Sequence, residues 1–318
     1  MIRILNAEPD DYFPEARKVL LQLGELTETK LSRADLLDRI STYDVLIVRL
    51  AHQVDRKLLD EGKNLKAVVS ATTGLDHIDL DYAANKGVAV LSLRGEVNFL
   101  RTVSATAEHT WALLLALLRR VPSAFDAVRQ GQWDRDAFRG HELDGKHLGI
   151  WGLGRVGEKV SRFGLAFGMQ VLAYDPYVQS SPYVVEYCND LTDFLHRSDV
   201  LSLHLPLNTE TTCLLNTQKL SHLPRGAILV NTSRGEIVDE EALVDALDTG
   251  HLAGAAIDVV THERCTQKRL NSPLLSYART HNNLLITPHI GGATFESMAK
   301  TELFMARKLS AFLRSQGI

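Results

Sequence analysis

"GIWGLGRVGEKV", residues 149–160, sets three glycines, Gly152, Gly154 and Gly157, between an apolar run and a segment whose apolar residues recur at helical spacing. A glycine turn between a strand and a helix lets the backbone approach a pyrophosphate, and the helix N-terminus attracts its negative charge. The stretch therefore predicts a nucleotide-binding strand–turn–helix unit. A tight turn that holds no ligand is the alternative.

An acidic residue follows at the distance that a dinucleotide site requires. The next apolar run, "QVLAYD", ends in Asp175, 18 residues after Gly157. A carboxylate there accepts hydrogen bonds from both ribose hydroxyls and repels a 2′-phosphate. Pro176 and Tyr177 follow it and neither is an arginine, which favours NAD over NADP. A methyltransferase with an adenosyl cofactor could share this loop and acid, so the rest of the chain must discriminate.

Around this unit the chain alternates short apolar runs with segments long enough for helices. Most of the runs are apolar throughout rather than alternating, which is typical of parallel strands covered on both faces. The pattern predicts an α/β protein with doubly wound sheets. The ten predicted strands are residues 2–5, 44–48, 66–70, 88–92, 147–151, 170–174, 199–204, 227–231, 254–258 and 283–287.

The strands fall into two groups, separated by a long helical pattern at about residues 103–120. A last helical pattern, residues 293–315, follows the final strand. We predict a nested arrangement, in which residues 1–100 and 291–318 form one domain and residues 101–290 form the other.

Composition excludes several classes of protein. The net charge is −4 over 318 residues, with no basic block for nucleic acid or for a membrane surface. The longest apolar run, residues 111–118, is too short to cross a bilayer, and the acidic start is not a signal peptide. The three cysteines, Cys188, Cys213 and Cys265, are odd in number and far apart in the sequence. We therefore expect no disulfide framework and no metal site. We also expect a cytoplasmic protein, in which the thiols are reduced.

Three further stretches each end an apolar run: "AILVNTSRGEIVDEEAL" (227–243), "GAAIDVVTHE" (254–263) and "LLITPHIGGAT" (284–294). The carboxyl ends of strands in a doubly wound sheet face the ligand crevice. Arg234, Glu263 and His289 are therefore expected at one rim.

Together these motifs resemble the D-isomer-specific 2-hydroxyacid dehydrogenases. "GLGRVG" with "YDP", "NTSRGEIVDEEAL" and "TPHIGGAT" stand in that family's order and spacing, and "TTGLDHIDL" (72–80) and "TAEHTWALLLALLRR" (106–120) also resemble family segments. The resemblance covers essentially the whole chain. It implies a Rossmann NAD-binding domain inserted into a flavodoxin-like substrate domain, NAD as cofactor, and a small 2-hydroxy or 2-oxo acid as substrate.

The resemblance also implies that Arg234, Glu263 and His289 are the catalytic set, and their chemistry agrees. An arginine presents a planar fork of donors that can hold a carboxylate and polarise the adjacent carbonyl. A histidine can give a proton to the carbonyl oxygen and take it back in the oxidation direction. A glutamate beside the imidazole orients the ring and favours its protonated form.

Further positions follow from the resemblance. The substrate carboxylate is expected at Thr73 and Gly74, with Arg49 and Arg234 as further substrate ligands. The "TAEHTWALLLALLRR" helix matches the family's dimer-forming helix, so a homodimer is expected; a buried helix within one chain is the alternative. The expected cofactor-binding residues are Gly152, Gly154, Arg155, Val156, Gly157, Asp175, His204, Pro206, Thr211, Thr232, Ser233, Asp258, Gly291 and Gly292.

Two departures leave the substrate open. Phosphoglycerate dehydrogenases carry an arginine shortly before the "TG" of the substrate loop, where this chain has Ser70. Both a D-3-phosphoglycerate dehydrogenase and a glyoxylate or hydroxypyruvate reductase are therefore retained. The segment 264–282, rich in basic residues, has no assigned role. An NAD(H)-binding, corepressor-like interaction protein without turnover is the alternative from another class, and the intact set of arginine, glutamate and histidine argues against it.

Overall fold

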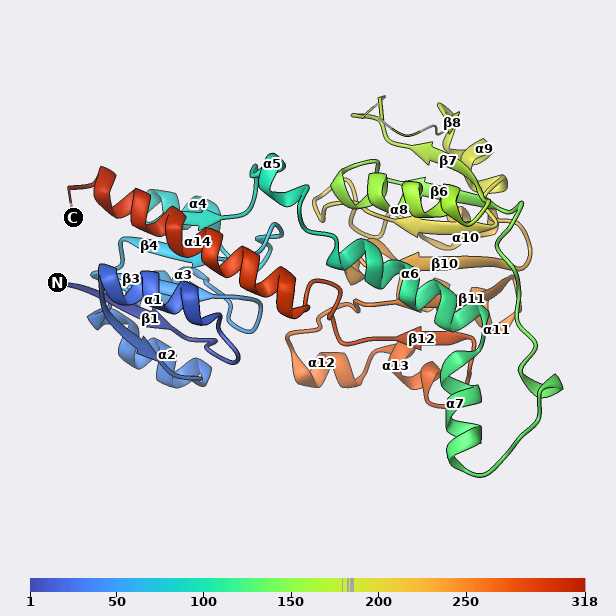
Figure 1. Ribbon diagram of the computed structural model, residues 1–318, viewed down its shortest axis with the longest axis horizontal. Coiled ribbons are helices and arrows are strands. Elements are labelled where there is room, and N and C mark those ends of the chain that lie inside the picture. Colours follow the sequence, from blue (N-terminus) through green and yellow to red (C-terminus); the bar gives the residue numbers. More distant parts are fainter. Residues whose placement is uncertain (179, 182, 184–185, 318) are drawn as a thin grey trace. The chain divides into compact units, whose positions relative to one another are not determined.

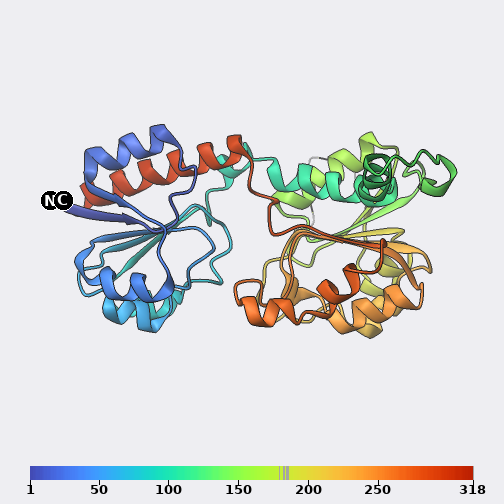
Figure 2. The same ribbon diagram turned by 90° about the horizontal axis from the view of Figure 1, so that it is seen from below.

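The computed structural model describes residues 1–178, 180–181, 183 and 186–317, and the chain forms two compact units. Unit 1 consists of Met1–Val103 and Ala293–Ile318, and unit 2 is Ser104–Gly292. Each unit is a parallel sheet with helices on both faces, as Figures 1 and 2 show.

Unit 1 has a five-stranded sheet in the order β2-β1-β3-β4-β5, the flavodoxin-like order. Helices α1 and α14 lie side by side on one face, and α2, α3 and α4 cover the other (Figure 2). The strands are β1 (Ile2–Asn6), β2 (Gly24–Glu28), β3 (Val45–Val48), β4 (Ala67–Ser70) and β5 (Ala89–Ser92). The helices are α1 (Pro14–Leu23), α2 (Arg33–Arg39), α3 (Arg56–Glu61), α4 (Leu80–Asn85), α5 (Val97–Leu100) and α14 (Phe295–Ser315).

Unit 2 has a seven-stranded parallel sheet in the order β12-β11-β10-β9-β6-β7-β8, which is the Rossmann order with one added strand. Its strands are β6 (His147–Trp151), β7 (Gln170–Tyr174), β8 (Glu186–Tyr187), β9 (Val200–Leu203), β10 (Ala227–Asn231), β11 (Leu252–Ile257) and β12 (Leu284–Ile286). Its helices are α6 (Ala105–Leu118), α7 (Val121–Arg129), α8 (Arg155–Ala166), α9 (Leu191–His196), α10 (Thr217–Ser221), α11 (Glu240–Asp248), α12 (Thr266–Leu270) and α13 (Pro273–Ala278).

The sheet of unit 2 is apolar on both faces because each face packs against helices. One face packs against α6 and α8, with Trp111, Leu114 and Val160 in its core. The other packs against α9, α10, α11 and α13, with Phe194 and Leu243 in its core. Burying one such side chain stabilises the fold by about 1.5–3 kcal/mol. The two hydrophobic layers thereby position the ends of the strands, which carry the candidate site.

The α/β, doubly wound fold class is confirmed, and each of the ten predicted strands forms. Two short edge strands escaped prediction. β2 reads "GELTE", in which polar residues outnumber apolar ones, and it pairs only with β1. β8 is two residues long.

No helix in the described part of the chain combines the length and apolarity needed to cross a membrane.

Candidate functional site

The glycine turn between β6 and α8 needs glycine at two positions for packing reasons alone. Gly152 has φ +96°, and a Cβ there would lie 2.6 Å from the carbonyl oxygen of His204. A Cβ on Gly157 would lie 2.2 Å from the carbonyl oxygen of Gly152. A Cβ on Gly154 would meet no atom within 4 Å. Packing within the chain therefore does not explain Gly154, whereas a pyrophosphate lying over the turn does.

Helix α8 begins directly after Gly154, and no side chain caps its first turn. Its first amide groups are therefore open to a ligand. Arg155, the first helical residue, is partly buried and has no hydrogen-bond or ion-pair partner among the residues described. Burial lowers the pKa of its guanidinium. A desolvated cation beside a helix N-terminus suits an anionic ligand, and Val156 follows it, also partly buried.

Asp175 lies just beyond the carboxyl end of β7 and is fixed to the glycine turn. Its Oδ2 accepts a hydrogen bond from the amide of Leu153 at 2.8 Å. Its Oδ1 accepts from the amides of Tyr177, at 2.8 Å, and Val178, at 3.0 Å. A carboxylate has about four acceptor positions, so one remains for a ribose hydroxyl. The turn, the helix and the acid together fit a dinucleotide.

The loop after β9 lies next to the glycine turn, at the point where the strand order reverses. The amide of His204 donates to the carbonyl of Trp151 at 2.8 Å, and its Nε2 lies 2.9 Å from Ser202 Oγ. Burial lowers the pKa of His204 to about 3, so the imidazole is neutral at physiological pH. The Thr211 hydroxyl donates to the carbonyl of Pro206 at 2.6 Å, which closes this loop on itself.

Arg234, Glu263 and His289 follow three neighbouring strands, β10, β11 and β12. A Cβ on Gly235 would lie 2.1 Å from the carbonyl carbon of Val260, so the turn that carries Arg234 lies against the backbone leading to Glu263. The two loops are also bonded: Glu236 Oε1 accepts from the amide of His262 at 3.4 Å. The topology therefore brings the three expected catalytic residues to one edge of one sheet.

Glu263 and His289 are in direct contact, with Glu263 Oε1 2.6 Å from His289 Nδ1. Each side chain is 22% exposed. The Nε2 of His289 has no hydrogen-bond partner within the described part of the chain. The histidine has φ +56°, a conformation that non-glycine residues rarely adopt. Such strain is held in place by neighbouring bonds and is concentrated at functional sites.

Asp258 holds the loop that carries His289. Its side chain is 2% exposed and accepts from the amides of Ile290, at 2.9 Å, and Gly291, at 2.7 Å. Thr287 Oγ1, at 2.6 Å, and His109 Nε2, at 3.2 Å, also contact it. Burial raises the pKa of Asp258, but these hydrogen bonds outweigh it and keep the pKa below the ordinary value. The amide of His289 donates to the Asp258 carbonyl at 2.8 Å.

The turn at residues 232–234 is braced by a buried asparagine. Asn231 Nδ2 donates to the carbonyl of Arg234 at 2.9 Å, and its Oδ1 accepts from the amide and hydroxyl of Ser233 at 3.0 and 2.7 Å. Thr232 Oγ1 lies 2.8 Å from Thr110 Oγ1 of α6. His109 and Asn231, which brace these loops, were not predicted as site residues, although both lie inside the motifs quoted from the sequence.

The segment 264–282 forms α12 and α13. Arg269 Nη1 donates to the carbonyl of Glu263 at 2.6 Å, so one basic residue of this segment supports the loop that carries Glu263. Leu274 and Tyr277 anchor α13 in the core. Cys265 is exposed. Gly292, at the end of unit 2, is free of close neighbours at its Cβ position.

The expected substrate residues of unit 1 lie just beyond the carboxyl ends of β3 and β4. Thr73 is exposed, and Thr72 Oγ1 donates to the carbonyl of Gly74 at 2.8 Å. Arg49 is paired within its own unit, with Nη2 2.5 Å from Glu302 Oε1. Its guanidinium charge is thus neutralised by the chain itself.

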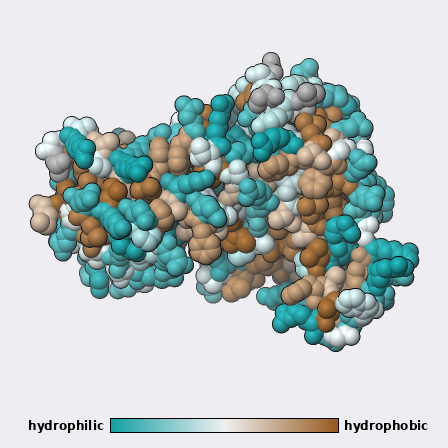
Figure 3. Space-filling model, viewed as in Figure 1, coloured by the Kyte–Doolittle hydropathy of each residue, from teal (hydrophilic) through white to brown (hydrophobic). Residues whose placement is uncertain are grey.

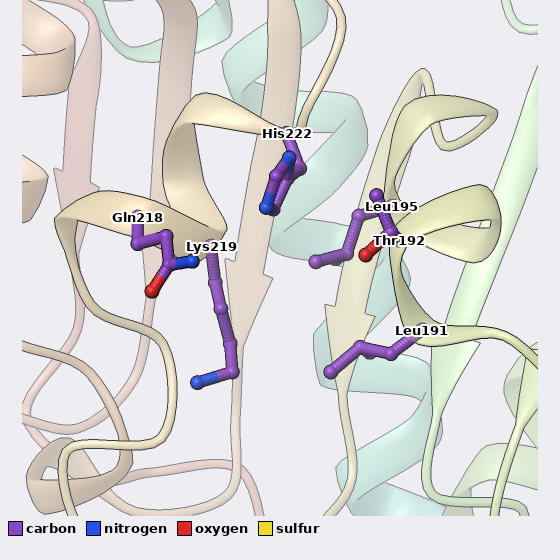
Figure 4. Close-up of a pocket in the computed structure, with 6 residues that line it drawn as sticks. All are labelled: Leu191, Thr192, Leu195, Gln218, Lys219 and His222. Carbon is purple, nitrogen blue, oxygen red and sulfur yellow. The ribbon is translucent and has the colours of Figure 1, made fainter.

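A pocket of about 220 Å³ lies elsewhere on unit 2, between α9 and α10 (Figure 4). Side chains from the two helices face each other across it. Its lining contains none of the candidate site residues: Leu191, Thr192, Leu195, Gln218, Lys219 and His222.

Comparison with known proteins agrees with this geometry. The model of the D-isomer specific 2-hydroxyacid dehydrogenase NAD-binding domain matches residues 111–291, more than half of the chain. A D-3-phosphoglycerate dehydrogenase of Methanocaldococcus jannaschii is 34% identical over 99% of this chain and 58% of its own length. The chain thus spans little more than half of that relative.

Two further relatives match along nearly their whole length. A hydroxypyruvate reductase of Thermotoga maritima is 36% identical over 93% of this chain and 94% of its own. The crystal structure of a D-lactate dehydrogenase from Aquifex aeolicus, complexed with NAD and lactic acid, superposes with a TM-score of 0.85 at 29% identity, covering 98% of this chain and 96% of that one. With its glycine turn, its acid and its paired glutamate and histidine, the chain belongs to the D-isomer specific 2-hydroxyacid dehydrogenase family.

Proposed function

We propose that the protein is an NAD-dependent dehydrogenase that interconverts a D-2-hydroxy acid and its 2-oxo acid, with His289 as the acid and base. The contact of 2.6 Å between Glu263 and His289 carries the proposal. That pair lies at the same sheet edge as the glycine turn, which supports a proton donor and a dinucleotide site at one rim.

The cofactor residues divide by the part of NAD they would hold. The turn at Gly154 and the guanidinium of Arg155 would take the pyrophosphate, and Asp175 the adenosine ribose. The loop carrying His204 would line the nicotinamide, where a neutral imidazole adds no positive charge beside the oxidised ring. When bound, the nicotinamide supplies the hydride that is added to C2 of the 2-oxo acid.

The chain's own residues handle the carboxylate and the proton. Arg234 holds the substrate carboxylate and polarises the neighbouring carbonyl. In unit 1, the amides of Thr73 and Gly74 are the proposed donors to a substrate carboxylate. Glu263 fixes Nδ1 of His289, which leaves Nε2 to give its proton to the carbonyl oxygen in reduction. In oxidation Nε2 takes the hydroxyl proton back.

The test measures NADH oxidation with a panel of 2-oxo acids. The configuration of each chiral product is then determined. Glyoxylate, hydroxypyruvate, pyruvate, phosphohydroxypyruvate and 2-oxoglutarate cover the acids that small members of this class could accept. We expect turnover with at least one, and the D isomer wherever the product is chiral. Tight NADH binding without turnover of any acid would favour the corepressor-like alternative. An L product would refute the stereochemical assignment.

We also propose that the chain forms a homodimer. Helix α6 is buried mainly against its own sheet, so it is not the exposed surface. Apolar side chains are exposed instead on and after α7: Val121, Phe125, Val128 and Trp133, the last 88% exposed. Figure 3 shows hydrophobic patches among hydrophilic residues over α7, at the lower right. Sedimentation velocity should give the mass of two chains, and Phe125→Asp with Trp133→Asp should give one. A wild-type monomer at micromolar concentration would contradict this.

A further inference from the structure

The loop after β3 in unit 1 forms a concavity of amide groups that a carboxylate of the same chain fills. Glu8 accepts hydrogen bonds from four consecutive backbone amides: Arg49 at 3.0 Å, Leu50 at 3.2 Å, Ala51 at 3.2 Å to each oxygen, and His52 at 3.4 Å. Successive amides that point at one centre form an anion-binding nest. We call the amides of residues 49–52 the β3 nest. The anion that this nest binds is the carboxylate of Glu8, a residue of the same chain.

The β3 nest lies on the edge of the sheet where ligands bind. Strands β1, β3 and β4 are neighbours, with Asn6 opposite Ile47 and Val48 opposite Ser70. Glu8, the β3 nest and the loop of Thr73 therefore follow adjacent strands at the same carboxyl edge. In doubly wound sheets that edge faces the ligand.

The positive charge at this edge, that of Arg49, is also neutralised by a carboxylate of the same chain. The guanidinium of Arg49 pairs with Glu302, whose side chain is 2% exposed, and its Nη1 donates to the carbonyl of Asp10 at 3.1 Å. It also stacks over the ring of Tyr12, 5.8 Å from the centroid. Ser70 is uncharged, and its Oγ lies 2.9 Å from Thr72 Oγ1. A nest and an arginine that could each bind a substrate anion are thus both occupied by carboxylates of the chain.

The amides of Thr73 and Gly74 differ from those of the β3 nest, because neither has an acceptor among the residues that the structure describes. We propose that Glu8 determines specificity: it closes the β3 nest, so that the edge takes the single carboxylate of a 2-oxo acid whose remainder carries no negative charge. A phosphate or second carboxylate would meet the charge of Glu8 and find the donors already used, and such like-charge contacts exclude wrong ligands. The proposal deepens the proposed dehydrogenase function and rests on it.

The first test compares hydroxypyruvate with its 3-phosphate in the wild-type protein. We expect kcat/KM to favour the unphosphorylated acid by about 100-fold or more, since a like-charge contact costs several kcal/mol. Glu8→Gln keeps the shape and removes the charge, so this ratio should fall by about tenfold or more within the variant. Glu25→Gln is the control, because Glu25 lies near the start of β2, where it faces Arg3, and its ratio should equal that of wild type.

The second test needs no turnover. In Glu8→Ala the β3 nest loses its carboxylate, and millimolar inorganic phosphate should bind there and raise the Tm by about 2 °C or more. Wild type and Glu25→Ala should not respond. A wild-type preference for the phosphorylated acid would overturn the proposal while leaving the dehydrogenase function intact, as would an unchanged ratio in Glu8→Gln. Failure of every 2-oxo acid would refute the dehydrogenase instead, and the phosphate response would still report on the β3 nest.

Discussion

Arg234 is the residue whose shape, as well as charge, the proposed chemistry requires. A guanidinium can bond a carboxylate with two parallel donors and still reach the carbonyl, whereas an ammonium is a point charge. Arg234→Lys should therefore lower kcat/KM for the 2-oxo acid by about 100-fold or more, while NADH affinity stays within about twofold. Steady-state kinetics and NADH fluorescence titration measure the two effects.

The control for this variant is Arg225→Lys, since Arg225 is exposed and its side chain donates to the carbonyl of Thr249 at 3.4 Å. It should behave as wild type. Equal kcat/KM in Arg234→Lys and wild type would remove Arg234 from the substrate site.

Single residues also set the limit of what sequence can predict. Glu263 and His289 were named from motifs, and the structure places them in contact. His109 and Glu8 were not named, because their partners are distant: His109 contacts a residue 149 positions away, and Glu8 contacts amides 41 to 44 positions away. No local pattern marks such a partner, since the tertiary fold alone brings the two together.

At the scale of elements, a substitution at Gly154 distinguishes a phosphate-binding turn from a plain turn between β6 and α8. Ala at this position clashes with nothing in the chain and suits its φ of −79°, so Gly154→Ala should leave the free energy of unfolding unchanged or raise it by about 0.4–1 kcal/mol. Its methyl group would displace the pyrophosphate, so NADH should bind about tenfold more weakly or worse. Urea unfolding and calorimetric titration test both. If Gly154→Ala bound NADH as tightly as wild type, the segment would be a plain turn with no role in binding the pyrophosphate.

The loop between β12 and α14 depends on Asp258 in a way that pH reveals. Because the pKa of Asp258 is lowered in the folded protein, its carboxylate contributes stability that is complete above the unfolded-state pKa of about 4 and is lost as pH falls through the folded-state pKa. Asp258→Asn should lower the free energy of unfolding by about 1–3 kcal/mol at pH 7. The difference should shrink below about pH 4. A difference in the free energy of unfolding that does not change with pH would show that the Asp258 carboxylate does not stabilise this loop through its charge.

Elements were predictable where burial is two-sided. β10 and β11 are buried strands between helices, and a continuous apolar run marks such strands. β2 lies at the sheet edge and keeps polar side chains such as Glu28, which binds Arg17 at 2.6 Å. An edge strand needs no apolar run, so its sequence resembles a loop.

On the scale of the whole molecule, the chain leaves unit 1 after Val103 and returns to it at Ala293. The returning helix α14 lies beside α1, and Glu302 of α14 accepts a hydrogen bond from the amide of Phe13 at 2.6 Å. Its helical pattern was visible in the sequence, but the polar contacts that dock it were not. This topology joins a dinucleotide-binding unit to a second unit by two crossings.

In the proposed reaction His289 exchanges the proton while the glycine turn holds the cofactor. The most direct test measures 2-oxo acid reduction and NADH affinity together in His289→Ala, with exposed His141→Ala as the control. We expect kcat to fall by about 100- to 10,000-fold in His289→Ala, NADH to bind as in wild type, and His141→Ala to be unaffected. Undiminished turnover in His289→Ala would contradict this role of His289.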